Sequence, residues 1–106
     1  QYLLSAILML LRENQLAEWV VVNFPFWPMP GTVFGLGFAL KEKPSEAESA
    51  LAVNEYHWGG LMGTHSWIAP EANIAALCFT QRFPGFWHPY SHEFKRLVYE
   101  AAEVGF

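Results

Sequence analysis

The sequence predicts an α+β fold, with an antiparallel sheet of three or four strands and an N-terminal and a C-terminal helix packed against it. Two segments with helical character lie near the ends of the chain, at 2–12 and 91–104. Between them, short strand-like segments follow one another across brief turn sequences. Strands joined in this way pair in antiparallel fashion, because parallel strands need a long crossover.

Residues 2–12 predict a helix that is apolar nearly all round, and such a helix is normally covered on most sides. The apolar run is about ten residues long, short of the ~20 that a membrane span requires. No basic stretch precedes it, which argues against a signal peptide. We therefore expect a buried helix and no transmembrane segment. Because the chain starts with Gln1 and not with Met, we also expect it to begin inside a longer protein.

Two aromatic loops that contain several prolines are predicted at 23–31 and 84–90. The first has three prolines within six residues, which excludes a regular helix or a central strand. Their Trp and Phe side chains suit stacking on sugars or other flat ligands, although packing is the commoner use of such residues. Residues 16–22 fit either a short second helix or an extended piece.

The predicted strands cover 33–40, 52–58, 61–68 and 74–81. Gly35 and Gly37 share one face of the first strand, which leaves room for a close neighbour. Residues 41–50 hold five of the sixteen charges and predict a solvated loop. Pro and Asn within 69–73 favour a tight reversal between the last two strands. The final strand is apolar at both alternating positions, so we expect it to be buried on both faces.

The C-terminal helix is predicted from its cap and its apolar stripe. Ser91 suits the N-cap position, and Glu93 then lies in the first turn, where a negative charge favours the helix dipole. Apolar residues recur at helical spacing, at Phe94, Leu97, Val98 and Ala101. The sequence therefore predicts an amphipathic helix that ends near Gly105.

Composition excludes several classes of protein. The chain is 53% apolar and 17% aromatic, with a formal net charge of -4. This is the opposite of a disordered tail, and the acidic surplus argues against a nucleic-acid partner. A single cysteine excludes an internal disulfide framework and Cys-rich zinc sites. So high an apolar content in so small a chain indicates that the chain binds an apolar partner or is part of a larger protein.

Four histidines raise the question of a metal site. His57 and His65 lie on neighbouring predicted strands and could approach each other, while a proline separates His88 from His92. No acid cluster accompanies them, and their spacing matches no recognised zinc pattern. We expect no metal site and no cofactor. Cys78 lies in the most apolar strand and is expected to be a buried, inert thiol.

The densest local signal runs from Glu55 to Trp67, where three glycines fall within five residues of strand-like sequence. Glycines at a strand edge let a substrate approach the backbone, whose N–H groups can stabilise an oxyanion. The alternative is a β-bulge or a sheet corner without chemistry, and bulges are frequent.

The same region carries a resemblance to a known family. Residues 56–60 (Tyr-His-Trp-Gly-Gly) and 63–71 (Gly-Thr-His-Ser-Trp-Ile-Ala-Pro-Glu) resemble the end of serine β-lactamase-like hydrolases. The closest resemblance is to class C β-lactamase-related esterases, that is, family VIII carboxylesterases and transesterases. Further segments resemble other parts of the family's fold. Residues 34–38 resemble its glycine-rich strand and 78–81 the strand after the motif, while 94–99 resemble its closing helix and 2–16 its Leu-rich helix.

The resemblance implies a β-lactamase/penicillin-binding-protein-like fold, of which residues 1–106 would be the C-terminal portion of a single domain. Trp58, Gly59 and Gly60 match the family's third active-site motif, where they would contact a small-molecule ester or amide substrate. The backbone N–H of Leu61 would be one of two oxyanion donors. The other would be the N–H of the nucleophilic serine, in the remainder of the parent domain.

The sequence departs from the family at its other two motifs. No serine of this chain is followed three residues later by lysine, and no tyrosine is followed two residues later by Asn or Ser. The nucleophile, its base and the catalytic tyrosine are therefore absent, and the chain alone is not expected to catalyse acyl transfer.

The substrate class can also be predicted, because Trp58 stands where β-lactamases have a lysine. This change removes the cation that would hold a β-lactam carboxylate, which favours an esterase or transesterase. The alternative is a non-catalytic binding module, or a pseudoenzyme remnant that uses its Trp-rich loops. Cytoplasm and periplasm both remain open as compartments.

Overall fold

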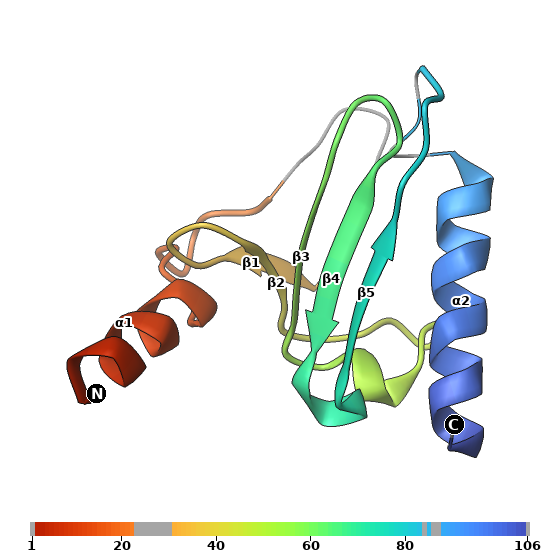
Figure 1. Cartoon of the computed structure of the whole chain (residues 1–106). Helices are drawn as coiled ribbons and strands as arrows, with labels where there is room; N and C mark the ends of the chain where they lie inside the picture. Colours follow the sequence, from red (N-terminus) through yellow and green to blue (C-terminus); the bar gives the residue numbers. More distant parts are fainter. Residues whose placement is uncertain (1, 23–30, 84, 86–87, 106) are drawn as a thin grey trace.

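The computed structural model describes residues 2–22, 31–83, 85 and 88–105. Within them a five-stranded antiparallel sheet has the order β1-β2-β3-β4-β5, with one helix near each end of the chain (Figure 1). The elements are α1 (Tyr2–Arg12), β1 (Thr32–Phe34), β2 (Ala39–Lys41), η1 (Ala50–Ala52), β3 (Glu55–Gly59), β4 (His65–Ala69), η2 (Pro70–Ala72), β5 (Ile74–Cys78) and α2 (Pro89–Val104). The predicted α+β class is confirmed, with five strands in place of three or four.

The additional strand arises because segment 33–40 folds back on itself. It forms the β1–β2 hairpin, in which Phe34 pairs with Ala39 across a turn that contains both glycines. At Gly35 a Cβ atom would collide with the backbone of Leu11, so the close approach of the end of α1 requires glycine there. The sequence predicted that a neighbour would approach closely here, and that neighbour is the end of α1.

Strands β3, β4 and β5 form the predicted meander. The reversal between β4 and β5 is η2 followed by Asn73, whose φ of 55° lies in the left-handed region that asparagine tolerates. β3 and β4 begin later than predicted, because η1 and the turn at Gly60–Thr64 occupy the residues before them.

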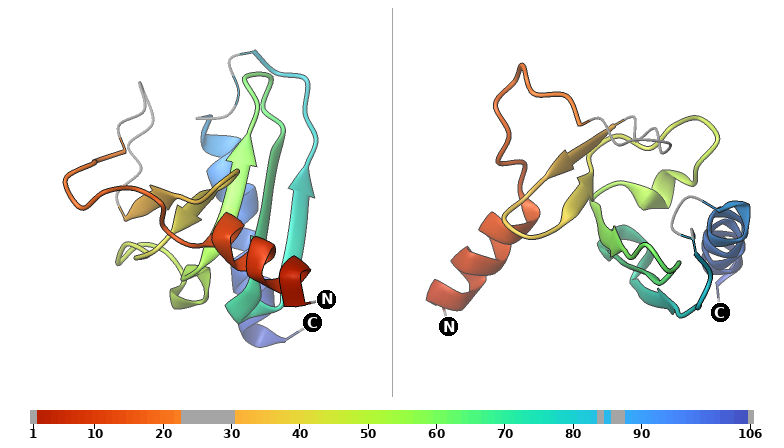
Figure 2. Two further views of the ribbon diagram at one scale, coloured as in Figure 1. Left: turned by 90° about the vertical axis from the view of Figure 1, so that its left-hand side faces the viewer. Right: turned by 90° about the horizontal axis from the view of Figure 1, so that it is seen from above.

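Helix α2 lies along one face of β4 and β5 (Figures 1 and 2). The core between them contains Trp67, Ala69, Ala52 and Tyr99. On the opposite face the side chains of β5 are exposed, and we call this face, which carries Trp58, Ile68 and Leu77, the open sheet face. The expectation that the last strand is buried on both faces is wrong, because no described element covers the open sheet face.

Packing of the N-terminal helix against the sheet is also not observed, because α1 has no buried residue. Only its end approaches the sheet, where the Gln15 N–H donates to the Phe34 carbonyl (2.8 Å) and the Arg12 guanidinium lies 5.6 Å from the centre of the Tyr56 ring. The rest of α1 projects away from the sheet, on the far side from α2 (Figure 2). In the described residues, no helix combines the length and the apolar character that crossing a membrane requires.

Helix α2 differs from its prediction at the cap and at the buried face. His88 is the N-cap, and its ring accepts a hydrogen bond from the backbone N–H two residues later, so Ser91 is not the cap. Phe94 and Leu97 of the predicted stripe are 37% and 50% exposed, whereas Ser91 and Tyr99 are buried. These polar side chains can face the sheet because each has a hydrogen-bond partner there.

Candidate functional site

The predicted site residues lie where β3 ends and turns into β4. Gly59 is the last residue of β3 and pairs with His65. The chain then reverses in a turn closed by two backbone hydrogen bonds, from the Gly60 N–H to the Thr64 carbonyl (2.7 Å) and from the Gly63 N–H to the Gly60 carbonyl (2.9 Å). We call residues 60–64 the glycine turn.

Leu61 presents its backbone N–H to the outside of the glycine turn. In a planar trans peptide the N–H points opposite to the carbonyl of the preceding residue. The Gly60 carbonyl points into the turn, where it accepts from Gly63, so the Leu61 N–H points outward. Leu61 is 51% exposed, and no described residue accepts a hydrogen bond from its N–H. Within the described residues, the fold thus makes no use of the predicted donor.

Trp58 precedes the turn and projects onto the open sheet face. It is 46% exposed, and its ring meets Phe34 edge to face with 5.6 Å between centroids. The adjoining hollow, about 360 Å³, is mostly apolar, and its walls include Tyr56, Ile68 and Leu77. A neutral, apolar surface therefore lies next to the residues of the third motif.

Gly60 and Gly63 differ in whether the fold could accept a larger residue at their position. A Cβ atom on Gly60 would meet nothing closer than 3.8 Å, so the fold accepts a side chain there. Gly63 has a φ of 93°, and a Cβ atom would collide with the hydroxyl groups of Thr80 and Tyr90. Sequence reasoning singled out Gly60 and missed Thr80 and Tyr90, since nothing local indicates that they approach the turn.

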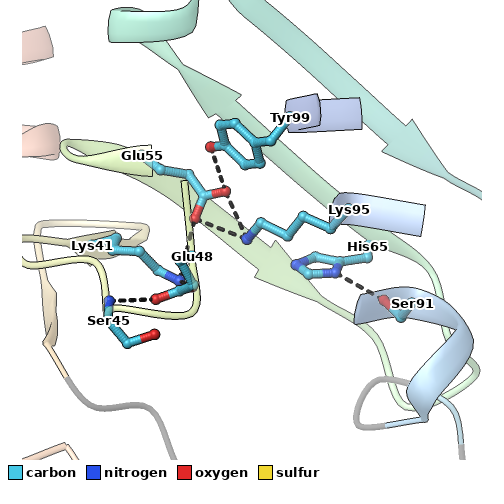
Figure 3. Close-up of polar contacts among 8 residues, drawn as sticks. All are labelled: Lys41, Ser45, Glu48, Glu55, His65, Ser91, Lys95 and Tyr99. Carbon is cyan, nitrogen blue, oxygen red and sulfur yellow. Dashed lines mark hydrogen bonds and ion pairs between the residues drawn. The ribbon is translucent and has the colours of Figure 1, made fainter. Parts of the chain in front are cut away.

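A buried ionic cluster occupies the other face of the sheet (Figure 3). Glu55 is fully buried, and its carboxylate accepts from Lys95 (2.8 Å) and from the Tyr99 hydroxyl (3.0 Å). Lys41 pairs with Glu48 and lies 4.0 Å from Glu55. Burial lowers the pKa of Lys95 even though Glu55 opposes that change. Burial, and then Glu55, raise the pKa of Tyr99.

His57 and His65 approach each other in this layer, as predicted, with ring centroids 5.9 Å apart. Burial, followed by the charge of Lys95, lowers the pKa of His57 to about 2 and that of His65 to about 3. Both rings are therefore neutral at pH 7. The Nδ1 atom of His65 lies 3.0 Å from the Ser91 hydroxyl, but Ser91 is only 1% exposed, so this Ser–His pair is closed to a substrate.

A larger cleft of about 820 Å³ lies between α2 and residues 47–52. Its described cations, Lys95 and Arg96, are already paired with carboxylates, so the cleft has no surplus positive charge. Among the described residues, no group of three or more His, Cys, Asp or Glu side chains could hold a metal ion. Cys78 ends β5 and is only partly buried, in contrast to the enclosed thiol expected.

No family model matches the sequence, and no curated protein matches it at a significant level. Function must therefore be inferred from the motif and from the geometry of the glycine turn. All of the aromatic loop predicted at 23–31 except Gly31 lies outside the described residues, Trp27 included. Of the loop predicted at 84–90, residues 84, 86 and 87 lie outside them, whereas Pro89 and Tyr90 are the first residues of α2 and not part of a loop.

Proposed function

We propose that this chain is the C-terminal part of a serine hydrolase domain that transfers acyl groups from small carboxylic esters. The observation that carries the proposal is the outward-facing Leu61 N–H directly after Trp58-Gly59-Gly60. A donor at this place in the motif is what a β-lactamase-related esterase requires for its oxyanion. The neutral Trp58 beside an apolar hollow suits an ester without a carboxylate.

In this reaction the chain stabilises the negative charge that develops on the carbonyl oxygen of the ester. A serine oxygen from the remainder of the domain attacks the ester carbonyl carbon, and the electron pair of the C=O bond moves to the oxygen. The Leu61 N–H donates to that oxyanion, and the N–H of the serine supplies the second hydrogen bond. When the intermediate collapses, the bond to the alcohol oxygen breaks, and this oxygen leaves as the alcohol with the proton that the serine hydroxyl had given to the lysine or tyrosine of the remaining domain. Water then attacks the acyl-serine, which releases the acid and restores the serine hydroxyl.

The reading frame upstream of Gln1 gives the first test. We expect an in-frame Ser-x-x-Lys followed by a tyrosine motif, which together would complete the site. An initiating methionine directly before Gln1, with no such motifs, would contradict the proposal.

Gly60→Val in the complete hydrolytic domain tests the role of Leu61. A Cβ atom on Gly60 would meet nothing closer than 3.8 Å, and we expect the branched side chain on the neighbouring residue to obstruct the approach to the Leu61 N–H. Loss of one oxyanion donor lowers the rate by ~10²–10³, so we expect kcat for a nitrophenyl ester to fall by a similar factor. Met62→Val, which places the same branched side chain in the same turn, is the control. Wild-type kcat in a normally folded Gly60→Val would exclude this turn from the site.

A further inference from the structure

The glycine turn is fastened to the segment that precedes α2 through consecutive carbonyl groups. The Leu61 carbonyl accepts from the Gly85 N–H, and the Met62 carbonyl accepts from the Arg82 N–H, each at 2.9 Å. Because these carbonyls point toward Arg82 and Gly85, the peptide N–H groups that follow them point away from these two residues.

Two hydroxyl groups complete this attachment. Thr80 donates to the Met62 carbonyl (3.1 Å), and Tyr90 donates to the Gly63 carbonyl (3.2 Å). The two hydroxyl oxygens also lie 2.5 Å apart, within hydrogen-bond distance of each other. Because each hydroxyl has one proton, two of these three hydrogen bonds form at a time, and the exchange between them couples the positions of both side chains to the same turn.

The backbone is shaped to admit these hydroxyls. At Gly63 a Cβ atom would occupy the space that the Thr80 and Tyr90 hydroxyls fill, and its φ of 93° suits glycine. A Cβ atom on Gly85 would lie 2.5 Å from the Cα of Gly63, so both glycines are needed for the approach. The two half-buried side chains therefore contact the turn closely on this side.

We propose that Tyr90, together with Thr80, is a positioning residue that aims the Leu61 N–H at the oxyanion. The inference rests on the proposed function, which gives that N–H its role. Neither hydroxyl touches the substrate. They act by holding the carbonyls of Met62 and Gly63, and the rigid peptide planes between Gly60 and Gly63 transmit that constraint to Leu61.

Amide hydrogen exchange in the complete hydrolytic domain tests the positioning itself. Tyr90→Phe keeps the ring and removes the hydroxyl. We expect exchange of the Gly63 and Gly85 amides to become about three- to tenfold faster, the effect of losing one net hydrogen bond, while the Trp67 amide in β4 keeps its rate. Tyr99→Phe is the matched control. It also removes a tyrosine hydroxyl from α2, but this hydroxyl donates to Glu55 and does not contact the glycine turn. Unchanged exchange at Gly63 and Gly85 in Tyr90→Phe would overturn the proposal.

Steady-state kinetics in the complete hydrolytic domain test the consequence. Tyr90→Phe and Thr80→Val should each lower kcat about tenfold and leave KM unchanged, since an oxyanion contact is made only in the transition state. Thr80→Ser, which retains the hydroxyl, should restore most of kcat. If Gly60→Val abolishes turnover while Tyr90→Phe leaves kcat intact, the proposed function stands and the positioning role is wrong. If Gly60→Val has no effect, the proposed function itself fails.

Discussion

At the scale of single residues, Glu55 shows how this fold accommodates charge in its interior. An isolated buried carboxylate would be strongly destabilising, and a paired one is tolerated only with good geometry. Glu55 meets that condition, since Lys95 contacts both of its oxygens and Tyr99 donates to one. None of this was predicted from the sequence, where Glu55, Lys95 and Tyr99 are far apart and resemble ordinary surface positions.

The neighbouring histidines predict a loss of stability in mild acid. The folded protein holds His57 and His65 neutral, with pKa values lowered to about 2 and about 3, whereas the unfolded chain takes up protons near pH 6.5. Their stabilising contribution is complete above pH 6.5 and is lost progressively below it. Each buried ring should cost about 1.4 kcal/mol per pH unit in that range.

Urea unfolding at pH 7.5, 6.5 and 5.5 measures this effect at fixed protein concentration. The window lies above the ordinary carboxylate range near pH 4, so the acids contribute little to the slope. His65→Asn retains a hydrogen-bonding group toward Ser91 and should remove the contribution of one ring, at most about 1.4 kcal/mol per pH unit, while His57 and His92, whose pKa burial also lowers, keep theirs. A midpoint independent of pH would show that these rings are not enclosed as described.

If the proposed function holds, Trp58 predicts the substrate class of the complete domain. Its indole has one N–H donor and no charge, whereas a lysine there would pair with a carboxylate through a bond worth roughly 1.5–3 kcal/mol, or about 10- to 150-fold in affinity. The protein should therefore turn over a short nitrophenyl ester far better than a chromogenic cephalosporin, as measured by kcat/KM. Trp58→Lys should narrow that ratio, and Trp58→Ala should lower ester turnover without improving the cephalosporin. A wild type that prefers the cephalosporin would show that Trp58 does not determine substrate class.

At the scale of elements, the two helices illustrate what sequence periodicity can and cannot predict. Both helices exist close to their predicted bounds, because continuous apolar or amphipathic runs indicate helix regardless of context. Their packing was harder to predict. The buried face of α2 is set by polar partners on the sheet, and α1 has no buried face at all. The segment 33–40 was predicted as one strand because nothing local distinguishes glycines within a strand from glycines in a hairpin turn.

This contrast predicts different sensitivities to mutation. Trp67 is enclosed at the centre of the core, so Trp67→Ala should lower the free energy of unfolding by about 3–5 kcal/mol. Leu8 of α1 is exposed, so Leu8→Gln should change it by no more than about 0.5 kcal/mol. Urea denaturation followed by tryptophan fluorescence compares the two. Equal losses would mean that α1 packs against the core in solution.

At the scale of the whole molecule, the apolar surface is divided between the α2 side of the sheet and two uncovered regions. One is α1, and the other is the open sheet face with Trp58, Ile68 and Leu77. Soluble monomers rarely expose contiguous apolar patches of this kind unless a partner covers them. The proposed parent domain supplies such a cover, and the high apolar content of the sequence then has a physical reason.

The isolated chain should therefore bind a hydrophobic dye strongly and self-associate. Replacing two residues of the open sheet face, Ile68→Thr with Leu77→Thr, should reduce both dye fluorescence and the association seen by analytical ultracentrifugation. A second double variant on α1, Leu4→Gln with Leu8→Gln, tests the other region separately. A monodisperse monomer that unfolds cooperatively and leaves the dye dark would contradict the division of surfaces described here.

β5 is the last strand of the sheet, and this position affects how the protein aggregates when it is misfolded or concentrated. Its outer edge carries backbone groups that can template a strand from another molecule. The segment Ile74–Phe79 has six residues without charge, proline or glycine, the signature of a sequence that stacks into cross-β fibrils with dry steric zippers. This segment therefore has the composition typical of amyloid-forming sequences and lies at an edge that no described strand covers, so we expect it to favour fibril formation at high concentration. A lysine at Leu77, whose side chain already faces solvent, would act as a gatekeeper there at little cost to the native sheet.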